Sequence, residues 1–141
     1  MKEFIKNILS FDKPGIYGKE ECLFVNANFV LVKDHKMIDD NEQNLHLTAW
    51  CRNINVKSLK DLNSNYIIHL KEIKSKVIDI IKTRYSGFNN LDIFIHYPPQ
   101  FWQLHIHFRN KSLAKTSPKN EIFYLKDVIK QLENTNFKCF L

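Results

Sequence analysis

Two alternating histidines, His105 and His107, lie in residues 103–109, and a third, His96, lies just upstream beyond a Pro-Pro pair. Side chains along a strand alternate between its two faces, so an extended segment places both histidines on one face and its aliphatic and aromatic residues on the other. The side chains expected on the imidazole face are those of Gln103, His105, His107 and Arg109. Since the apolar face would pack against a core, the imidazole face is expected to meet a ligand.

Three interpretations are open for these imidazoles. They can be ordinary polar surface of a strand. They can bind zinc, which accepts imidazole nitrogens at roughly 2.0–2.1 Å, but no cysteine or acidic residue stands nearby in the sequence as an obvious further ligand, so we expect no metal. They can also supply a nucleophile, because a neutral imidazole nitrogen attacks phosphorus while neighbouring histidines and Arg109 offset the phosphate charge.

Two strands joined by a turn must position the three histidines. Residues 91–97 have the composition of a strand that pairs with the histidine strand. Pro98 and Pro99 have no backbone N–H for a strand ladder, so the chain is expected to turn there. His96 is therefore expected near the open end of this strand pair.

The rest of the chain predicts an α+β layout. Expected strands cover residues 21–26, 29–33 and 45–52, and residues 14–18 are expected to form a loop because they include one proline and two glycines. Apolar residues at helical spacing predict helices over residues 2–9, 65–85 and 121–133.

Length and composition limit the class of protein. The 141 residues predict one domain. The formal net charge of +6 suits an anionic partner such as a nucleotide or RNA, but a solvated basic surface is the more common cause of such a charge. Cys22, Cys51 and Cys139 are odd in number and lack CxxC spacing, which predicts a reduced location in the cytoplasm or nucleus. No apolar run approaches the roughly 20 residues of a membrane span.

The histidine segment and several other segments resemble a known family. The run Gln103-Leu104-His105-Ile106-His107-Phe108 is similar to the histidine-triad (HIT) motif, in which the middle histidine is the nucleophile. The longer pattern His96-Tyr97-x-Pro99-x-Phe101-Trp102-x-Leu104-His105-x-His107-Phe108 resembles the scavenger mRNA decapping enzymes of that superfamily. Residues 29–36, 45–51 and 58–62 agree in order and spacing, so the likeness runs from about Phe29 to Glu133 and more weakly from Phe4.

The resemblance implies a fold and an activity. The fold would be HIT-like, an antiparallel sheet with a long helix and a C-terminal helix in one domain over residues 1–141, which would pair as a homodimer. The activity would be cleavage of the triphosphate bridge of a short 7-methylguanosine-capped RNA or cap dinucleotide, releasing 7-methylguanosine monophosphate without a cofactor.

The resemblance also implies a role for each site residue. His105 would attack phosphorus, while His96 and His107 would stabilise charge and assist proton movement. The expected substrate-binding residues are Gln103, Lys36, Asp34, Arg109, Phe101, Gln100 and Phe4. Among them, Lys36 would add a positive contact, Asp34 would meet the guanine edge, and Phe4 would offer an aromatic face to the cationic base. For Phe4 a helix core position is an equal alternative, and Trp50 and Trp102 are expected to be packing residues.

The chain departs from the family pattern in two ways. Gln103 stands where the family has its first histidine, and Gln100 stands where it has a serine. An amide hydrogen-bonds but does not carry a proton, so we expect an altered or slower enzyme, and we expect Gln103→His to leave activity equal or higher. In the family, an N-terminal domain closes over the cap as a lid. This chain begins near the catalytic domain, so we expect it to select substrates without that lid.

Two other functions remain open at this stage. The chain can be a HIT hydrolase of general nucleoside phosphates, which a weak requirement for the methyl group would favour. It can also be a cap- or nucleotide-binding protein with little turnover, because Gln103 replaces a titratable group and the basic surface suits RNA.

Overall fold

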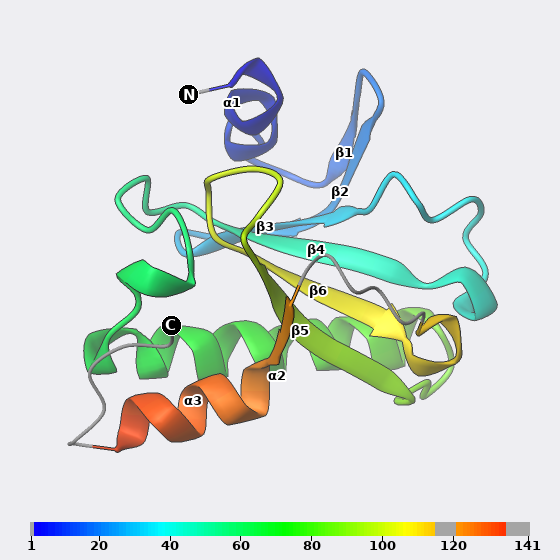
Figure 1. Ribbon diagram of the computed structural model, residues 1–141. Helices are drawn as coiled ribbons and strands as arrows, with labels where there is room; N and C mark the ends of the chain where they lie inside the picture. Colours follow the sequence, from blue (N-terminus) through cyan, green and yellow to red (C-terminus); the bar gives the residue numbers. More distant parts are fainter. Residues whose placement is uncertain (1, 115–120, 135–141) are drawn as a thin grey trace.

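A computed structural model describes residues 2–114 and 121–134 as an α+β structure built on one antiparallel sheet (Figure 1). Seven strands follow the order β1-β2-β3-β4-β6-β5-β7 across the sheet. They are β1 Gly15–Tyr17, β2 Glu20–Val25, β3 Phe29–Lys33, β4 His46–Cys51, β5 Leu91–Tyr97, β6 His105–Asn110 and β7 Glu121–Tyr124. The helices are α1 Glu3–Leu9, α2 Ile67–Arg84 and α3 Leu125–Glu133, and this arrangement confirms the expected fold class.

The larger core lies on the sheet face covered by α2 and α3 (Figure 1). Helix α2 buries Leu70, Ile73, Val77 and Ile81, whose spacing of three and four residues forms one stripe. That stripe packs into a cluster with the inward residues of the central strands, Leu47 and Ala49 of β4 and Ile106 and Phe108 of β6. Full burial of these side chains fixes which face of each strand is apolar.

The opposite sheet face is covered by the short helix α1 at its β2 and β3 side (Figure 1). Ile5 and Ile8 of α1 pack against Val30, Val32 and Trp50 in a second, smaller cluster. No helix within the described ranges lies over β5 and β6 on this face. The histidine strand therefore presents its polar face on the side of the sheet that α1 covers only in part.

Two segments differ from the expectation. The expected loop at residues 14–18 contains β1, which pairs with β2 through a hairpin whose turn uses Gly18 at φ +61°. Residues 121–124 were expected to begin the last helix, but they form β7, which pairs with β5. Ile122 lies three residues before Leu125 and so fits the helical spacing, yet its backbone pairs with β5 and the helical stripe begins at Leu125.

The expectation for Cys139 cannot be compared with the structure, because this residue lies outside the described residues. Within residues 2–114 and 121–134, no helix has the length and apolarity to cross a membrane.

Candidate active site

The register of three neighbouring strands brings together the histidines that the sequence singled out. His107 of β6 lies between Thr48 of β4 and Phe94 of β5, and His105 lies opposite Trp50 of β4. Both histidines are buried, with 9% of His105 and 6% of His107 exposed. The His105 and His107 ring centres are 5.1 Å apart, and the His96 and His107 ring centres are 4.8 Å apart. The three histidines therefore form one cluster, as the sequence predicted.

His105 is held in a single tautomer. Its Nδ1 lies 2.8 Å from the backbone carbonyl oxygen of Gln103, and since a carbonyl only accepts, Nδ1–H must be the donor. Burial lowers the pKa of His105, which keeps the ring neutral and leaves a lone pair on Nε2. Trp50 stacks on the ring at 4.0 Å between centres and 17° between planes, so its orientation is fixed as well. The ring thus has the protonation state of a nucleophile.

His107 and His96 each leave one nitrogen for a ligand. His107 stacks on Phe94 with the ring centres 5.0 Å apart and the planes 9° apart, while its Nε2 is buried without a hydrogen-bond partner among the described residues. The Nδ1 of His96 is likewise buried without a hydrogen-bond partner among the described residues. Burial lowers the pKa of both histidines, and neighbouring positive groups lower each further. Buried polar atoms are normally paired, so these two nitrogens are candidates to contact a bound phosphate.

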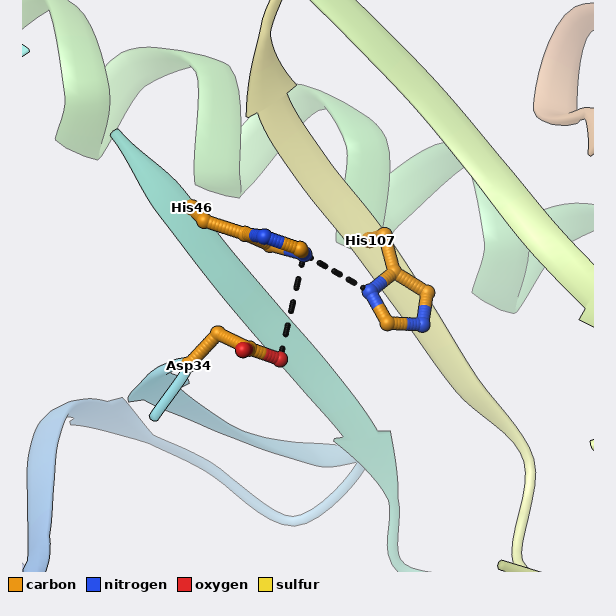
Figure 2. A group of neighbouring side chains, drawn as sticks. All are labelled: Asp34, His46 and His107. Carbon is orange, nitrogen blue, oxygen red and sulfur yellow. Dashed lines mark hydrogen bonds and ion pairs between the residues drawn. The ribbon is translucent and has the colours of Figure 1, made fainter. Parts of the chain in front are cut away.

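His46 joins the histidine cluster through His107, although the sequence-based prediction did not include it. Its Nε2 lies 2.9 Å from Nδ1 of His107 and 3.8 Å from Oδ2 of Asp34 (Figure 2). Burial lowers the pKa of His46 to about 4, although the Asp34 carboxylate opposes that effect. Alternation along β4 would have revealed it, because His46, Thr48 and Trp50 must share the face opposite to Leu47 and Ala49.

A pocket on this face gathers most of the expected site residues. Its lining includes eight of them: His96, His105, His107, Asp34, Lys36, Gln100, Phe101 and Phe4. Aromatic rings form one wall, where Phe4 of α1 lies 4.9 Å from Phe101 and 5.8 Å from Trp50 between ring centres. Phe4 therefore packs against other rings and also lines the pocket, so both interpretations of it hold.

Seven residues that were not expected at the site also line the pocket, and Glu20, Thr48 and Trp50 are among them. Burial raises the pKa of the Glu20 carboxyl. Trp50 was expected only to pack, and it does so directly against His105. Trp102, also expected to pack, is half exposed and contacts Tyr97 edge to face.

Gln103 does not occupy the ligand-facing position that the sequence predicted. Its side chain is 1% exposed, and its amide nitrogen donates to the backbone carbonyls of Cys51 and Asn53 at 2.6 and 2.9 Å. It is absent from the described lining of the pocket. A single NH2 group supplies both hydrogens, so Gln103 connects the end of β4 to the start of the histidine strand. The expectation of direct substrate contact by its side chain is corrected accordingly.

Arg109 shares the imidazole face but is engaged elsewhere. Its guanidinium lies 3.7 Å from the Asp92 carboxylate and 4.6 Å from the centre of the Phe94 ring. Its positive charge lowers the pKa values of His46 and His96. Arg109 is also absent from the described lining of the pocket, so the structure does not support the expected direct contact with phosphate. Arg109 instead acts on the histidines through its charge.

The antiparallel sheet and its paired imidazoles define a histidine-triad domain. A family model described as "Scavenger mRNA decapping enzyme C-term binding" matches residues 11–123. The chain belongs to this family.

Two m7GpppX diphosphatases agree with that assignment over part of their length. The m7GpppX diphosphatase of Caenorhabditis elegans is 33% identical over 107 residues, which cover 74% of this chain and 34% of that protein. The human m7GpppX diphosphatase is 31% identical over 138 residues, covering 93% of this chain and 40% of that protein. The chain thus spans between a third and two fifths of these relatives. The crystal structure of the aprataxin ortholog Hnt3 from Schizosaccharomyces pombe superimposes with a TM-score of 0.49 and 14% identity, covering 92% of this chain and 78% of that one.

The two hydrogen bonds of Gln103 predict the effect of restoring a histidine. A neutral imidazole has one N–H, so Gln103→His leaves one of the two carbonyls without this donor. We expect the free energy of unfolding to fall by about 1–2 kcal/mol in urea titrations, with no gain in activity. Gln100→His, at an exposed amide, is the control and should unfold as the wild type does. Unchanged stability together with faster turnover would instead support the original expectation of a ligand contact.

Burial of His46 predicts that acid destabilises the fold. Its pKa is about 4 when folded against an ordinary value of 6.5, so between these values the unfolded chain binds more protons and stability rises with pH. Stability should therefore be full above about pH 6.5 and decline as the pH falls towards about 4. Urea titrations across this range in the presence of chelator measure the decline. His46→Gln should make it shallower, whereas His69→Gln, at an exposed position on α2, should leave it unchanged; equal slopes for wild type and His46→Gln would refute this cause.

Proposed function

We propose that this domain hydrolyses the triphosphate bridge of 7-methylguanosine cap dinucleotides or short capped RNA fragments. The observation that carries the proposal is the state of His105, a neutral ring whose Nδ1–H is bound to the Gln103 carbonyl and whose Nε2 lone pair is free. Family membership and the similarity to m7GpppX diphosphatases support this choice of substrate.

The proposed reaction has two steps at phosphorus. Nε2 of His105 bonds to the phosphorus next to 7-methylguanosine, and the P–O bond to the rest of the bridge breaks, so an RNA fragment with a 5′-diphosphate leaves. Water then attacks the same phosphorus and the P–N bond breaks, which releases 7-methylguanosine monophosphate and restores the neutral imidazole. Holding the ring in line with phosphorus supplies much of the acceleration in each step.

Neighbouring groups would stabilise the charge that develops on phosphate oxygens. His96 and His107 line the pocket, each with one nitrogen that has no hydrogen-bond partner among the described residues, and the exposed Lys36 adds a positive charge there. Donors already in place need no reorganisation during the reaction, and burial strengthens their effect. The proposed chemistry therefore uses side chains of this chain alone.

The aromatic wall would hold the base. The methylated guanine is cationic, and a cation is attracted to the face of an aromatic ring. Phe4 and Phe101 present such rings at the pocket, and the Asp34 carboxylate, which borders the same pocket, would accept hydrogen bonds from the guanine edge.

Two further expectations stay predictions: that two copies pair as a homodimer, and that the protein acts in the cytoplasm or nucleus.

The nucleophile assignment predicts a specific loss of activity. His105→Ala should lower hydrolysis of m7GpppG by roughly a thousandfold or more with the fold retained, because no other group can form the covalent intermediate. His96→Ala and His107→Ala should cost less, since each removes only part of the charge stabilisation. His69→Ala is the matched control on the far helix α2. Retention of more than about a tenth of wild-type activity by His105→Ala would refute the assignment.

A covalent histidine mechanism predicts independence from metals. Hydrolysis of m7GpppG should persist in excess chelator, because the attacking group is an imidazole and not a metal-bound water. Running unmethylated GpppG in parallel tests the substrate: equal rates would favour a general nucleoside-phosphate hydrolase. Binding of both dinucleotides without turnover would favour a binding protein instead. Activity that disappears with chelator and returns with zinc would overturn the mechanism.

A further inference from the structure

We propose that Asp34, His46 and His107 form a binding site for a divalent transition metal such as zinc, and that the bound ion inhibits hydrolysis in the pocket. Each residue offers one ligand atom, and the three atoms lie within 4.8 Å of one another (Figure 2). Two imidazoles and one carboxylate make a common zinc donor set, which leaves the fourth tetrahedral position open for water.

Closing around an ion requires the donor atoms, which lie up to 4.8 Å apart, to shift by about 1 Å. Nε2 of His46 lies 2.9 Å from Nδ1 of His107 and 3.8 Å from Oδ2 of Asp34. Tetrahedral bonds of roughly 2.0–2.2 Å separate neighbouring donor atoms by about 3.3–3.5 Å. The two nitrogens would therefore move apart slightly while the carboxylate moves closer. All three groups are already aimed towards a common region from different parts of the sheet (Figure 2).

The backbone holds two of the ligands beside each other. The N–H of Asp34 donates to the carbonyl of His46 at 2.9 Å, where the chain leaves β3 and enters β4. His107 lies on the adjacent strand β6, with its ring fixed by stacking on Phe94. Side chains that are positioned before binding lose little conformational entropy when an ion arrives. This arrangement distinguishes the cluster from the exposed His35, which lies 3.6 Å from the other oxygen of Asp34.

The ion would replace an existing hydrogen bond. His46 and His107 share one proton between Nε2 and Nδ1, and an ion needs the lone pairs of both nitrogens. Because His107 carries its hydrogen on Nε2, the shared proton belongs to the neutral His46 ring, and it would move to Nδ1 of His46 when the ion binds. Nε2 of His107, which has no partner among the described residues, remains outside the coordination and keeps its own hydrogen.

Inhibition follows if the proposed function holds, and this part of the inference rests on it. Asp34 would contact the guanine edge and His107 would stabilise phosphate charge, so an ion that takes both excludes the substrate from these contacts. The catalytic cycle itself needs no ion. Zinc would thus act against the reaction, and a chelator would restore it.

Zinc titration by calorimetry tests the site without using activity. The wild-type chain, cleared of metal with chelator and then dialysed, should bind one zinc ion at this site, and Co²⁺ should give the visible absorption of a four-coordinate ion. His46→Asn should weaken zinc binding by about tenfold or more, as should Asp34→Asn, while the exposed control His69→Asn binds as wild type does. Thermal unfolding of each variant without metal establishes that it is folded. Absent binding, or binding that neither substitution weakens, would overturn the site.

Hydrolysis of m7GpppG with added zinc then separates the two proposals. Wild type should slow as zinc saturates the calorimetric site and recover with chelator, whereas His46→Asn should need about tenfold more zinc for the same loss of its own rate. Zinc binding that depends on His46 in a chain without hydrolysis would overturn the proposed function and keep the site. Hydrolysis that continues unchanged at zinc saturation would overturn the inhibition.

Discussion

The pairing register between β4 and β6 is the constraint on which the site depends. It places Trp50 opposite His105 and Thr48 opposite His107. A shift of one residue would turn both imidazoles into the core under α2, because successive side chains of a strand point to opposite faces. Leu47 and Phe108, which are fully buried on that other face, resist such a shift. The apolar packing on one side of the sheet therefore fixes the chemistry on the other.

Burial then determines the protonation state of the histidines. Removal from water disfavours the imidazolium form, which lowers the pKa of His46, His96, His105 and His107 alike. Neutral rings keep a lone pair for attack, and two of them lie flat against aromatic neighbours that fix their planes. The same environment thus fixes both the protonation state and the orientation of the proposed nucleophile. Its cost is a cluster of bases that oppose folding in acid.

Local patterns in the sequence predicted most of the strands and helices, and the histidine cluster with them. Alternation gave the faces of β6, and helical spacing gave α2 within two residues at each end. Apart from β1, which pairs with β2 in a local hairpin, the errors came from contacts between distant segments. Residues 121–124 form a strand because the edge of β5 is available to them, and the bonds of Gln103 lead to carbonyls about fifty residues away. His46 was accessible to the same alternation argument, but its partner His107 lies 61 residues along the chain.

The part of the pocket wall formed by Phe4 is held in place differently from the strands that carry the histidines. Helix α1 has seven residues, too few for a stable helix alone, and packing by Ile5 and Ile8 holds it on the sheet. The imidazoles, by contrast, lie on central strands that are paired on both sides. Under the proposed function, Phe4 would bind the base from a separately supported element, whereas Phe101 and Asp34 would bind it from outside α1. Changes in α1 would then alter the fit of the base without disturbing the strands that hold the histidines.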